Sequence, residues 1–96
     1  MTAKRGMPSS QPGSLRIDQL LWRLRFAKTR GIAQKNIAAK PIRLNGRRVQ
    51  RSSTMVQAED ILTMPSGEAA IALRIIAIPA RRGPAAEAQS CYEILQ

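Results

Sequence analysis

The sequence predicts an α+β fold, with a helical hairpin packed on a small, mostly antiparallel β-sheet and a helix near the C-terminus. Two amphipathic segments come first, and an Asn-Gly turn between two short β-forming runs follows them. Several short apolar runs and a final Ala-rich segment complete the chain. At 96 residues, the chain is expected to have a single small core.

Residues 1–15 are expected to form a flexible basic tail. This segment has no apolar periodicity, and Pro8, Pro12 and Gly13, with their Ser and Gln neighbours, are typical of linkers. Its two bases, Lys4 and Arg5, can add a weak phosphate contact.

A first helix is expected from Asp18 to about Ala27. The Asp18 carboxylate suits the unpaired amide groups and the positive dipole end of a helix start. Ile17 and Trp22 stand at the two positions of a hydrophobic staple, so we expect Trp22 in the core. Leu20, Leu21 and Leu24 complete the apolar face, while Arg16, Gln19, Arg23 and Arg25 lie toward its edges or outside it.

A second helix is expected from a cap at Thr29 to about Ala39, with Pro41 ending it. Two short helices joined so closely form a helical hairpin. A basic helical hairpin is also the form of a DNA-reading helix-turn-helix, which stays an alternative here. The pattern places Ile32, Ala33 and Ile37 in the core and points Arg30, Gln34 and Lys35 elsewhere.

The sequence from Ile42 to Val49 predicts a β-hairpin around Asn45-Gly46, because a two-residue primed turn needs positive φ at both central positions. In this register Leu44 pairs with Arg47, and Arg43 pairs with Arg48 on the face opposite the apolar residues. Like charges placed opposite each other repel unless an anion lies between them. We interpret the Arg43 and Arg48 pair as a phosphate-binding feature, and a solvated face is the alternative.

The rest of the chain predicts three more strands and a helix. Two short strands, at residues 55–56 and 61–64, flank an acidic turn at Glu59 and Asp60. A turn at residues 65–68 leads to an apolar run at residues 71–78, expected to be a strand covered on both faces or crossed by a bulge. After Gly83-Pro84, residues 85–95 predict a helix with Cys91 on one face.

Positive charge is concentrated in the first half of the folded region. The chain has 16 Lys and Arg against 6 Asp and Glu, a net charge of +10 and a pI near 11.5. Residues 16–51 hold eleven bases and one acid, Asp18, whereas residues 52–96 hold three bases and five acids. A face that is charged only for solubility normally mixes both signs. A polyanionic partner, nucleic acid first, is therefore expected.

Other classes of function have little support in the sequence. The chain has one cysteine and no histidine, so the usual metal-ligand sets are missing and no cofactor is expected. Its carboxylates and Cys91 offer no poised catalytic group, and Asp18 is better explained as a cap, so we do not expect an enzyme. No apolar run reaches about 18 residues and no secretion signal is recognisable, so we expect a cytoplasmic protein. Membrane binding by the first helix is disfavoured, because the bases continue through the β-hairpin.

Residues that carry a resemblance to a known family lie in both expected helices and in the Asn-Gly turn. They are Arg16-Ile17-Asp18-Gln19-Leu20-Leu21-Trp22, Lys28-Thr29-Arg30, Ala33-Gln34, Ile37, Leu44-Asn45-Gly46 and Val49. This pattern resembles the S4 RNA-binding domain, named after a small-subunit ribosomal protein, and covers residues 16–64. The run from Arg81 to Gln89, with Tyr92 and Glu93, looks like the tail of the fifteen-kilodalton ribosome-associated heat-shock protein family. Residues 65–96 are then an extension that adds a strand and a helix.

The resemblance implies that RNA is gripped across the basic face of the helical hairpin and the adjoining β-turn. It implies ribosomal RNA of the large subunit as the partner, including subunits that still carry tRNA, and a stress-response role in returning stalled subunits to translation. We expect the protein to be a monomer. The RNA-binding residues that the resemblance implies are Arg16, Lys28, Thr29, Arg30, Gln34, Asn45, Arg47, Arg48 and Arg51, and the charge argument adds Arg43.

Two positions depart from the family pattern. Ala39-Lys40-Pro41 replaces the usual glycine after the second helix, so this helix must end with a different geometry. Glu59 stands where the turn usually has glycine, so an altered loop is expected there. The alternatives left open are a DNA-binding helix-turn-helix-like protein and a stand-alone relative of the RNA-binding module of pseudouridine synthases. Stacking of Trp22 or Phe26 on a base is disfavoured against packing in the core.

Overall fold

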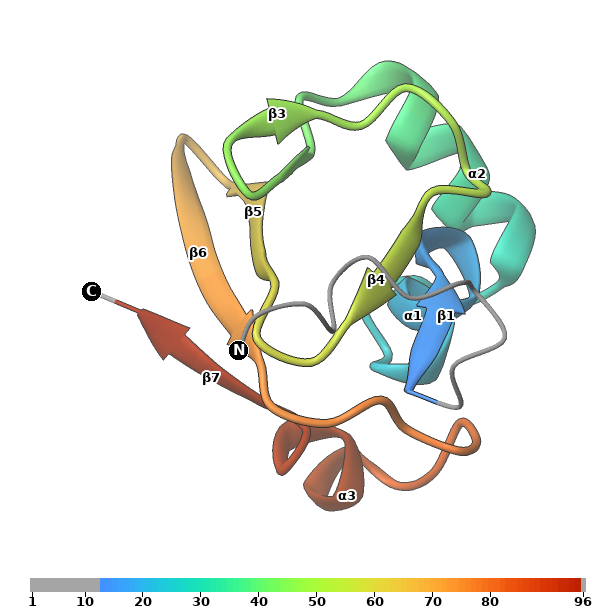
Figure 1. The fold of residues 1–96 in the computed structure, drawn as a ribbon. Coiled ribbons are helices and arrows are strands. Elements are labelled where there is room, and N and C mark those ends of the chain that lie inside the picture. Colours follow the sequence, from blue (N-terminus) through green and yellow to red (C-terminus); the bar gives the residue numbers. More distant parts are fainter. Residues whose placement is uncertain (1–12, 96) are drawn as a thin grey trace.

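The computed structural model describes residues 13–95, so most of the expected tail, residues 1–12, lies outside the described residues. The predicted α+β fold is confirmed: a helical hairpin lies beside antiparallel strands (Figure 1). Within residues 13–95, no helix is long and apolar enough to cross a membrane. In chain order the elements are β1 (Ser14–Arg16), α1 (Ile17–Arg23), α2 (Arg30–Ala39), β2 (Arg43–Leu44), β3 (Arg47–Arg48), β4 (Met55–Gln57), β5 (Ile61–Ser66), β6 (Ala69–Ile75), α3 (Ala85–Gln89) and β7 (Tyr92–Leu95).

The described strands form two antiparallel sheets. The larger sheet has five strands in the order β3-β2-β5-β6-β7, and the smaller sheet pairs β1 with β4. β1 begins at Ser14, inside the segment that the sequence assigns to the tail, and Leu15 lies opposite Val56 of β4. The backbone amide of Ile17 then donates to the carbonyl of Thr54 at 2.8 Å. The small sheet therefore fixes the point at which α1 begins.

α1 differs from the prediction at both ends. Arg16 is the N-cap residue and makes no side-chain capping bond, whereas Asp18, the predicted cap, lies inside the first turn. The helix ends at Arg23 and not near Ala27, because Arg25 has a φ of +68°, which a continuing right-handed helix does not allow.

α2 follows the prediction more closely. The Thr29 hydroxyl oxygen accepts a hydrogen bond from the Ile32 amide at 3.1 Å, so the predicted cap is confirmed. Lys40 leaves the helix in an extended conformation, with φ −114°, which is the different exit geometry expected without glycine. Ile32, which the pattern places in the core, is 41% exposed, because Ala33 and Ile37 form the buried face of α2.

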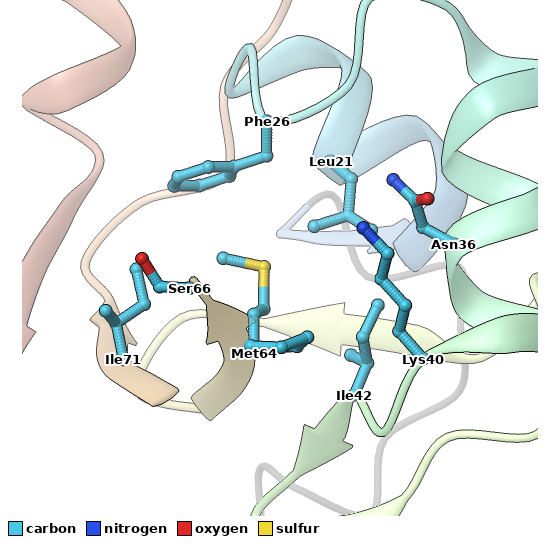
Figure 2. Close-up of a pocket in the computed structure, with 9 residues that line it drawn as sticks. Leu21, Phe26, Asn36, Lys40, Ile42, Met64, Ser66 and Ile71 are labelled. Atoms are coloured by element: carbon cyan, nitrogen blue, oxygen red, sulfur yellow. The ribbon is translucent and has the colours of Figure 1, made fainter. Parts of the chain in front are cut away.

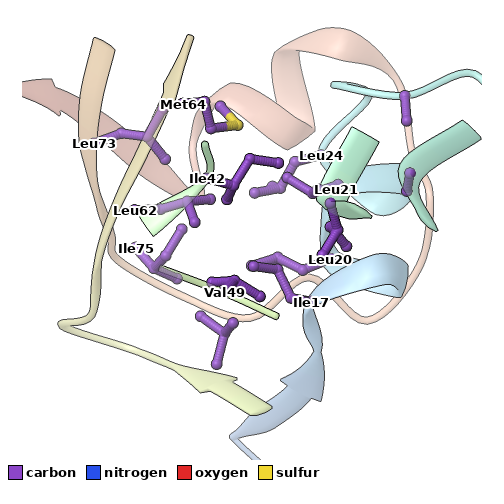
Figure 3. Packing of buried hydrophobic residues seen from close by; sticks show 14 of the residues in the cluster. Ile17, Leu20, Leu21, Leu24, Ile42, Val49, Leu62, Met64, Leu73 and Ile75 are labelled. Carbon is purple, nitrogen blue, oxygen red and sulfur yellow. The ribbon is translucent and has the colours of Figure 1, made fainter. Parts of the chain in front are cut away.

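The core lies between the helical hairpin and the larger sheet (Figure 3). Leu20 and Leu21 of α1 and its C-cap residue Leu24 face Leu62 of β5 and Leu73 of β6, and all five are at most 2% exposed. Burial of such a side chain contributes about 1.5–3 kcal/mol relative to leaving it exposed. These aliphatic contacts hold the sheet against the hairpin, as the scarcity of aromatic residues predicts.

The apolar run at residues 71–78 is not one continuous strand. β6 begins two residues earlier, at Ala69, and ends at Ile75. Ile76 is 44% exposed, so the run does not continue into a strand covered on both faces. The preceding turn is also shorter than predicted and consists of Gly67 and Glu68, since β5 extends through Ser66.

The predicted helix at residues 85–95 is wrong in its second half. α3 ends at Gln89, and β7 pairs with β6 from Tyr92 to Leu95. Cys91 is buried between these two elements and does not lie on a helix face. The edge of β6 offers a row of backbone donors and acceptors, and Tyr and Ile favour strands. Sheet pairing therefore overrides helix propensity after the Ala-rich turn.

The turn before β5 has a positive φ at Glu59, although glycine, which favours that conformation, is missing from this position. Glu59 has a φ of +79°, so the loop is not altered in the way that the missing glycine predicts. The Glu59 amide donates to the Ile75 carbonyl at 2.7 Å, and the Asp60 carboxylate accepts from the Gln57 amide at 2.9 Å. These bonds hold Glu59 in a conformation that costs a non-glycine residue about 1–3 kcal/mol.

Candidate nucleic-acid interface

A buried carboxylate organises the first part of the basic surface. The Asp18 side chain on α1 is 0% exposed, and its Oδ1 accepts from Arg16 Nε at 3.1 Å and from the Gln19 amide at 2.8 Å. Its Oδ2 accepts from Arg16 Nη2 at 2.9 Å, Gln34 Nε2 at 2.9 Å and Arg30 Nε at 3.3 Å. Arg16, Asp18, Arg30 and Gln34, called here the Asp18 cluster, therefore join α1 to α2 and bring three predicted site residues together.

The Asp18 cluster keeps one positive charge uncompensated at the surface. Burial raises the pKa of Asp18, but the hydrogen bonds from Arg16, Gln34, Arg30 and the Gln19 amide outweigh it and lower the pKa from 3.8 to about 2. Asp18 is therefore ionised at neutral pH. The side chains of Arg16 and Arg30 are 39% and 41% exposed, so both guanidinium groups still reach solvent.

The predicted Asn-Gly turn and its register are confirmed. Asn45 and Gly46 have φ values of +53° and +86°, as a primed turn requires, and Arg43 lies opposite Arg48. Arg43, Arg47 and Arg48 are all exposed. Arg43 Nη1 donates to the Gly46 carbonyl at 3.2 Å, so this side chain bends back over the turn.

The Asn45 side chain, although exposed, joins the turn to the start of β5. Its Oδ1 accepts from the Ile61 amide at 2.9 Å, and its Nδ2 donates to the buried Asp60 carboxylate at 3.2 Å. The Asn45 backbone amide also donates to the Ile61 carbonyl at 2.7 Å. Both ends of its side-chain amide are thus used within the protein, which fixes the turn against the start of β5.

The remaining predicted site residues fall into two kinds. Thr29 uses its hydroxyl oxygen to cap α2. Lys28 and Arg51 are exposed in the same way as Arg47 and Arg48. Within residues 13–95, the side chains of these four bases make no hydrogen bond or ion pair. Their charges are therefore available to attract an external anion, as are those of the exposed Lys35 and Lys40.

Two of the three bases of residues 52–96 have acidic partners, and the third, Arg82, contacts Trp22. Arg74 donates to Glu93 at 3.0 Å, and Arg81 lies 2.7 Å from Glu87. These acids do not gather around a metal ion: within the described residues, no three His, Cys, Asp or Glu side chains are placed to hold one. Within residues 13–95, the positive charge without an acidic partner therefore lies mainly in residues 16–51.

Two arginines at the end of α1 have a structural role that the sequence does not signal. Arg23 Nη1 donates to the Pro79 carbonyl at 2.9 Å, and Arg25 Nη1 donates to the Gly83 carbonyl at 2.8 Å. The partners are 56 and 58 positions apart, a separation that no periodic pattern reveals. These bonds draw the segment before α3 along the end of α1.

Trp22 does not lie in the core, contrary to the sequence prediction. It is half-buried and is not part of the core cluster. Arg82 Nε donates to the Trp22 carbonyl at 3.0 Å, and the Arg82 guanidinium lies 5.7 Å from the centroid of the indole ring. With Gln19, Thr29 and Arg30, Trp22 lines an open depression of about 420 Å³, called here the Trp22 hollow.

A second hollow, of about 280 Å³, lies on the other flank of α2. Figure 2 shows the Phe26 ring facing Met64 across it, with the side chains of Asn36 and Lys40 together at one side. None of the predicted RNA-binding residues is in its wall, so it is separate from the basic surface. The full lining is Leu21, Phe26, Asn36, Lys40, Ile42, Met64, Pro65, Ser66 and Ile71.

Comparisons with known proteins agree with the geometry. The model of the S4 domain family matches residues 15–62. Heat shock protein 15 of Escherichia coli K12 is 35% identical over 79 residues, which cover 82% of this chain and 59% of that protein. Small ribosomal subunit protein uS4 of Acinetobacter baylyi is 38% identical over 71 residues, or 71% of this chain and 34% of that protein.

A solved structure is also similar over most of its length. The trimeric structure of Vibrio cholerae heat shock protein 15 aligns with a TM-score of 0.77 and 30% sequence identity, over 85% of this chain and 82% of that one. The chain spans 59% of the length of the Escherichia coli relative that it matches. The S4 family match, residues 15–62, includes the helical hairpin and the Asn-Gly turn.

Proposed function

Because the chain belongs to the S4 domain family, and to the heat shock protein 15 group within it, we propose that it binds ribosomal RNA on the large subunit and assists the return of stalled subunits to translation. The S4 domain is an RNA-binding domain, so RNA is the class of partner that membership implies. The role is non-catalytic and works through binding alone.

One observation carries this proposal: bases without an acidic partner are concentrated in residues 16–51. The single acid of residues 16–51 is buried beneath Arg16 and Arg30, whereas Arg74 and Arg81, two of the three bases of residues 52–96, pair with acids on the surface. A surface of unpaired bases binds a polyanion by releasing its counterions. The bases that carry this attraction are Lys28, Arg47, Arg48 and Arg51.

The ten predicted site residues take two roles in the proposal. Direct phosphate contacts come from Lys28, Arg43, Arg47, Arg48 and Arg51, and from the exposed parts of Arg16 and Arg30. Thr29, Gln34 and Asn45 position these bases, because each already donates or accepts a hydrogen bond within the protein.

RNA is favoured over DNA by the composition of α2. A helix-turn-helix would insert the exposed face of this helix into the major groove, where arginine, asparagine and glutamine read base edges. Apart from Arg30 and Gln34, whose side chains bind Asp18, that face offers Gly31, Ile32, Lys35, Ala38 and Ala39. An RNA hairpin should therefore bind more tightly than a DNA hairpin of the same sequence. Equal affinities would favour the helix-turn-helix alternative.

Co-sedimentation with separated ribosomal subunits tests the proposed target. Wild type is compared with the Arg47→Gln, Arg48→Gln double variant, and the control is Arg74→Gln with Arg81→Gln, which removes the same charge from arginines paired with acids. We expect wild type and control to sediment with the large subunit and the Arg47, Arg48 variant to remain largely in the supernatant. Sedimentation of wild type with the small subunit alone, or with neither subunit, would contradict the proposal.

A further inference from the structure

Two residues that line the Trp22 hollow, Gln19 and Trp22, take no part in the RNA contacts assigned so far. Gln19 and Trp22 of α1 form one side of this depression of about 420 Å³, and Thr29 and Arg30 at the start of α2 form the other. Thr29 and Arg30 are also predicted RNA-binding residues, so the hollow adjoins the proposed RNA surface. A partly exposed aromatic ring beside a cation is a combination that recognises unstacked nucleobases.

The C-terminal segment holds the Trp22 indole in a fixed position. The Arg82 Nε donates to the Trp22 carbonyl at 3.0 Å, and the Arg82 guanidinium lies 5.7 Å from the ring centroid, within the range of a cation–π contact. Arg82 thereby joins the extension to α1, in addition to the bonds from Arg23 and Arg25. A ring that is anchored but half-exposed loses little conformational freedom when a ligand stacks on it.

The polar groups around the hollow suit a nucleotide. Arg30 binds Asp18 through Nε at 3.3 Å while its side chain stays 41% exposed, so its two terminal amino groups can donate to a phosphate or a base edge. Gln19 Oε1 accepts from Arg23 Nη2 at 3.1 Å, which orients the Gln19 amide and leaves its NH₂ group as a donor.

We propose that the Trp22 hollow binds one unpaired nucleotide of the RNA, with its base stacked on Trp22 and its phosphate at Arg30. This inference rests on the proposed RNA-binding function and adds a single-stranded position to it. The bases of a duplex are stacked on one another and cannot enter, so the nucleotide comes from a bulge or a loop. The hollow of Figure 2 suits this ligand less well, because its wall is mainly aliphatic and holds one cation, Lys40.

Trp22 is the single tryptophan of the chain, so its fluorescence reports on the hollow directly. Two dye-labelled RNA hairpins are compared, identical except that one carries a bulged purine, and anisotropy of the dye measures binding of each. We expect the bulged hairpin to quench Trp22 emission in step with its binding curve, and the fully paired hairpin to bind with little quenching.

Two results of this titration would overturn the inference, and only one of them would also overturn the proposed RNA-binding function. Binding of the bulged hairpin by anisotropy with unchanged Trp22 emission would overturn the nucleotide site and leave the proposed function in place. Failure of both hairpins to bind would overturn the proposed function, and the nucleotide site with it.

Variants at Trp22 separate stacking from a structural role. Trp22→Leu should weaken binding of the bulged hairpin by about tenfold or more and leave binding of the paired hairpin unchanged. Trp22→Phe keeps an aromatic face and should recover most of the loss. Circular dichroism and a urea titration establish that both variants fold. Equal weakening toward both hairpins in a folded Trp22→Leu variant would assign Trp22 a structural role and overturn the inference.

Discussion

Asp18 is the single acid among residues 16–51, and it accepts hydrogen bonds from both helices of the hairpin. An acid at this position of the sequence predicts a helix cap, which locates the start of α1 correctly to within one residue. The sequence does not reveal that Arg30 and Gln34, 12 and 16 positions later, turn back to the same carboxylate. They meet there because residues four apart share one face of a helix.

Removal of the Asp18 charge should destabilise the fold. Asp18→Asn leaves Arg16 and Arg30 without their buried counter-ion, and we expect the free energy of unfolding to fall by about 2–3 kcal/mol. Urea denaturation followed by circular dichroism measures the change. Glu68→Gln is the control, since Glu68 is an exposed acid in the turn between β5 and β6, and it should change stability by less than about 0.5 kcal/mol. Equal stabilities of the two variants would contradict the assigned role of Asp18.

The lowered pKa of Asp18 predicts a particular acid sensitivity. Its pKa is about 2 in the folded protein against 3.8 for the ordinary group, so its contribution to stability is present above about pH 4 and is lost as the pH falls toward 2. The shift corresponds to about 2 kcal/mol. Unfolding free energies of wild type measured between pH 5 and pH 2 should therefore fall more steeply than those of Asp18→Asn. Parallel curves would show that another group controls this pH range.

At the scale of elements, the sequence predicts secondary structure correctly where the local residue pattern determines it. The prediction fails where pairing with a segment distant in the sequence determines it. The Asn45-Gly46 turn needs two positive φ values, and few other sequences supply them as well, so its position and register are correct. The segment from Tyr92 to Leu95 continues an Ala-rich helical pattern, yet it forms β7 because β6 has an open edge. Nothing in the local sequence marks that edge.

Within the Asn-Gly hairpin, stability and RNA affinity should depend on different residues. Asn45→Ala removes the partner of the Ile61 amide and one of the partners of the buried Asp60, so the free energy of unfolding should fall by about 2 kcal/mol. Arg47→Ala changes an exposed residue of the same hairpin, and it should leave stability within about 0.5 kcal/mol while weakening RNA binding. Urea titration and RNA-binding anisotropy distinguish the two. A large loss of stability in Arg47→Ala would contradict this division.

At the scale of the whole molecule, charge and core composition are predicted well, and the attachment of the C-terminal extension is not. The bases of residues 16–51 are easily counted in the sequence. The bonds from Arg23 and Arg25 to the carbonyls of Pro79 and Gly83 depend on the completed fold. Trp22, close to this junction, is half-buried beside Arg82 and lies outside the core.

The molar mass in solution tests the expectation of a monomer. One edge of the larger sheet is β3, which is two arginines long, and short charged edges disfavour pairing between sheets. We therefore expect light scattering to give a mass near 10.6 kDa at micromolar concentration, unlike the trimeric Vibrio cholerae relative. A mass three times larger would show that this chain assembles as that relative does.

The salt dependence of RNA affinity tests the central claim, that the unpaired bases of residues 16–51 bind RNA phosphates. Anisotropy with a structured RNA is recorded across a salt series for wild type, for Arg47→Gln with Arg48→Gln, and for the control Arg74→Gln with Arg81→Gln. Log affinity should fall linearly with log salt concentration, and loss of Arg47 and Arg48 should make the slope shallower by about 1.5–2, whereas the control should keep the wild-type slope. An unchanged slope in the Arg47, Arg48 variant, or an equal change in the control, would contradict the claim.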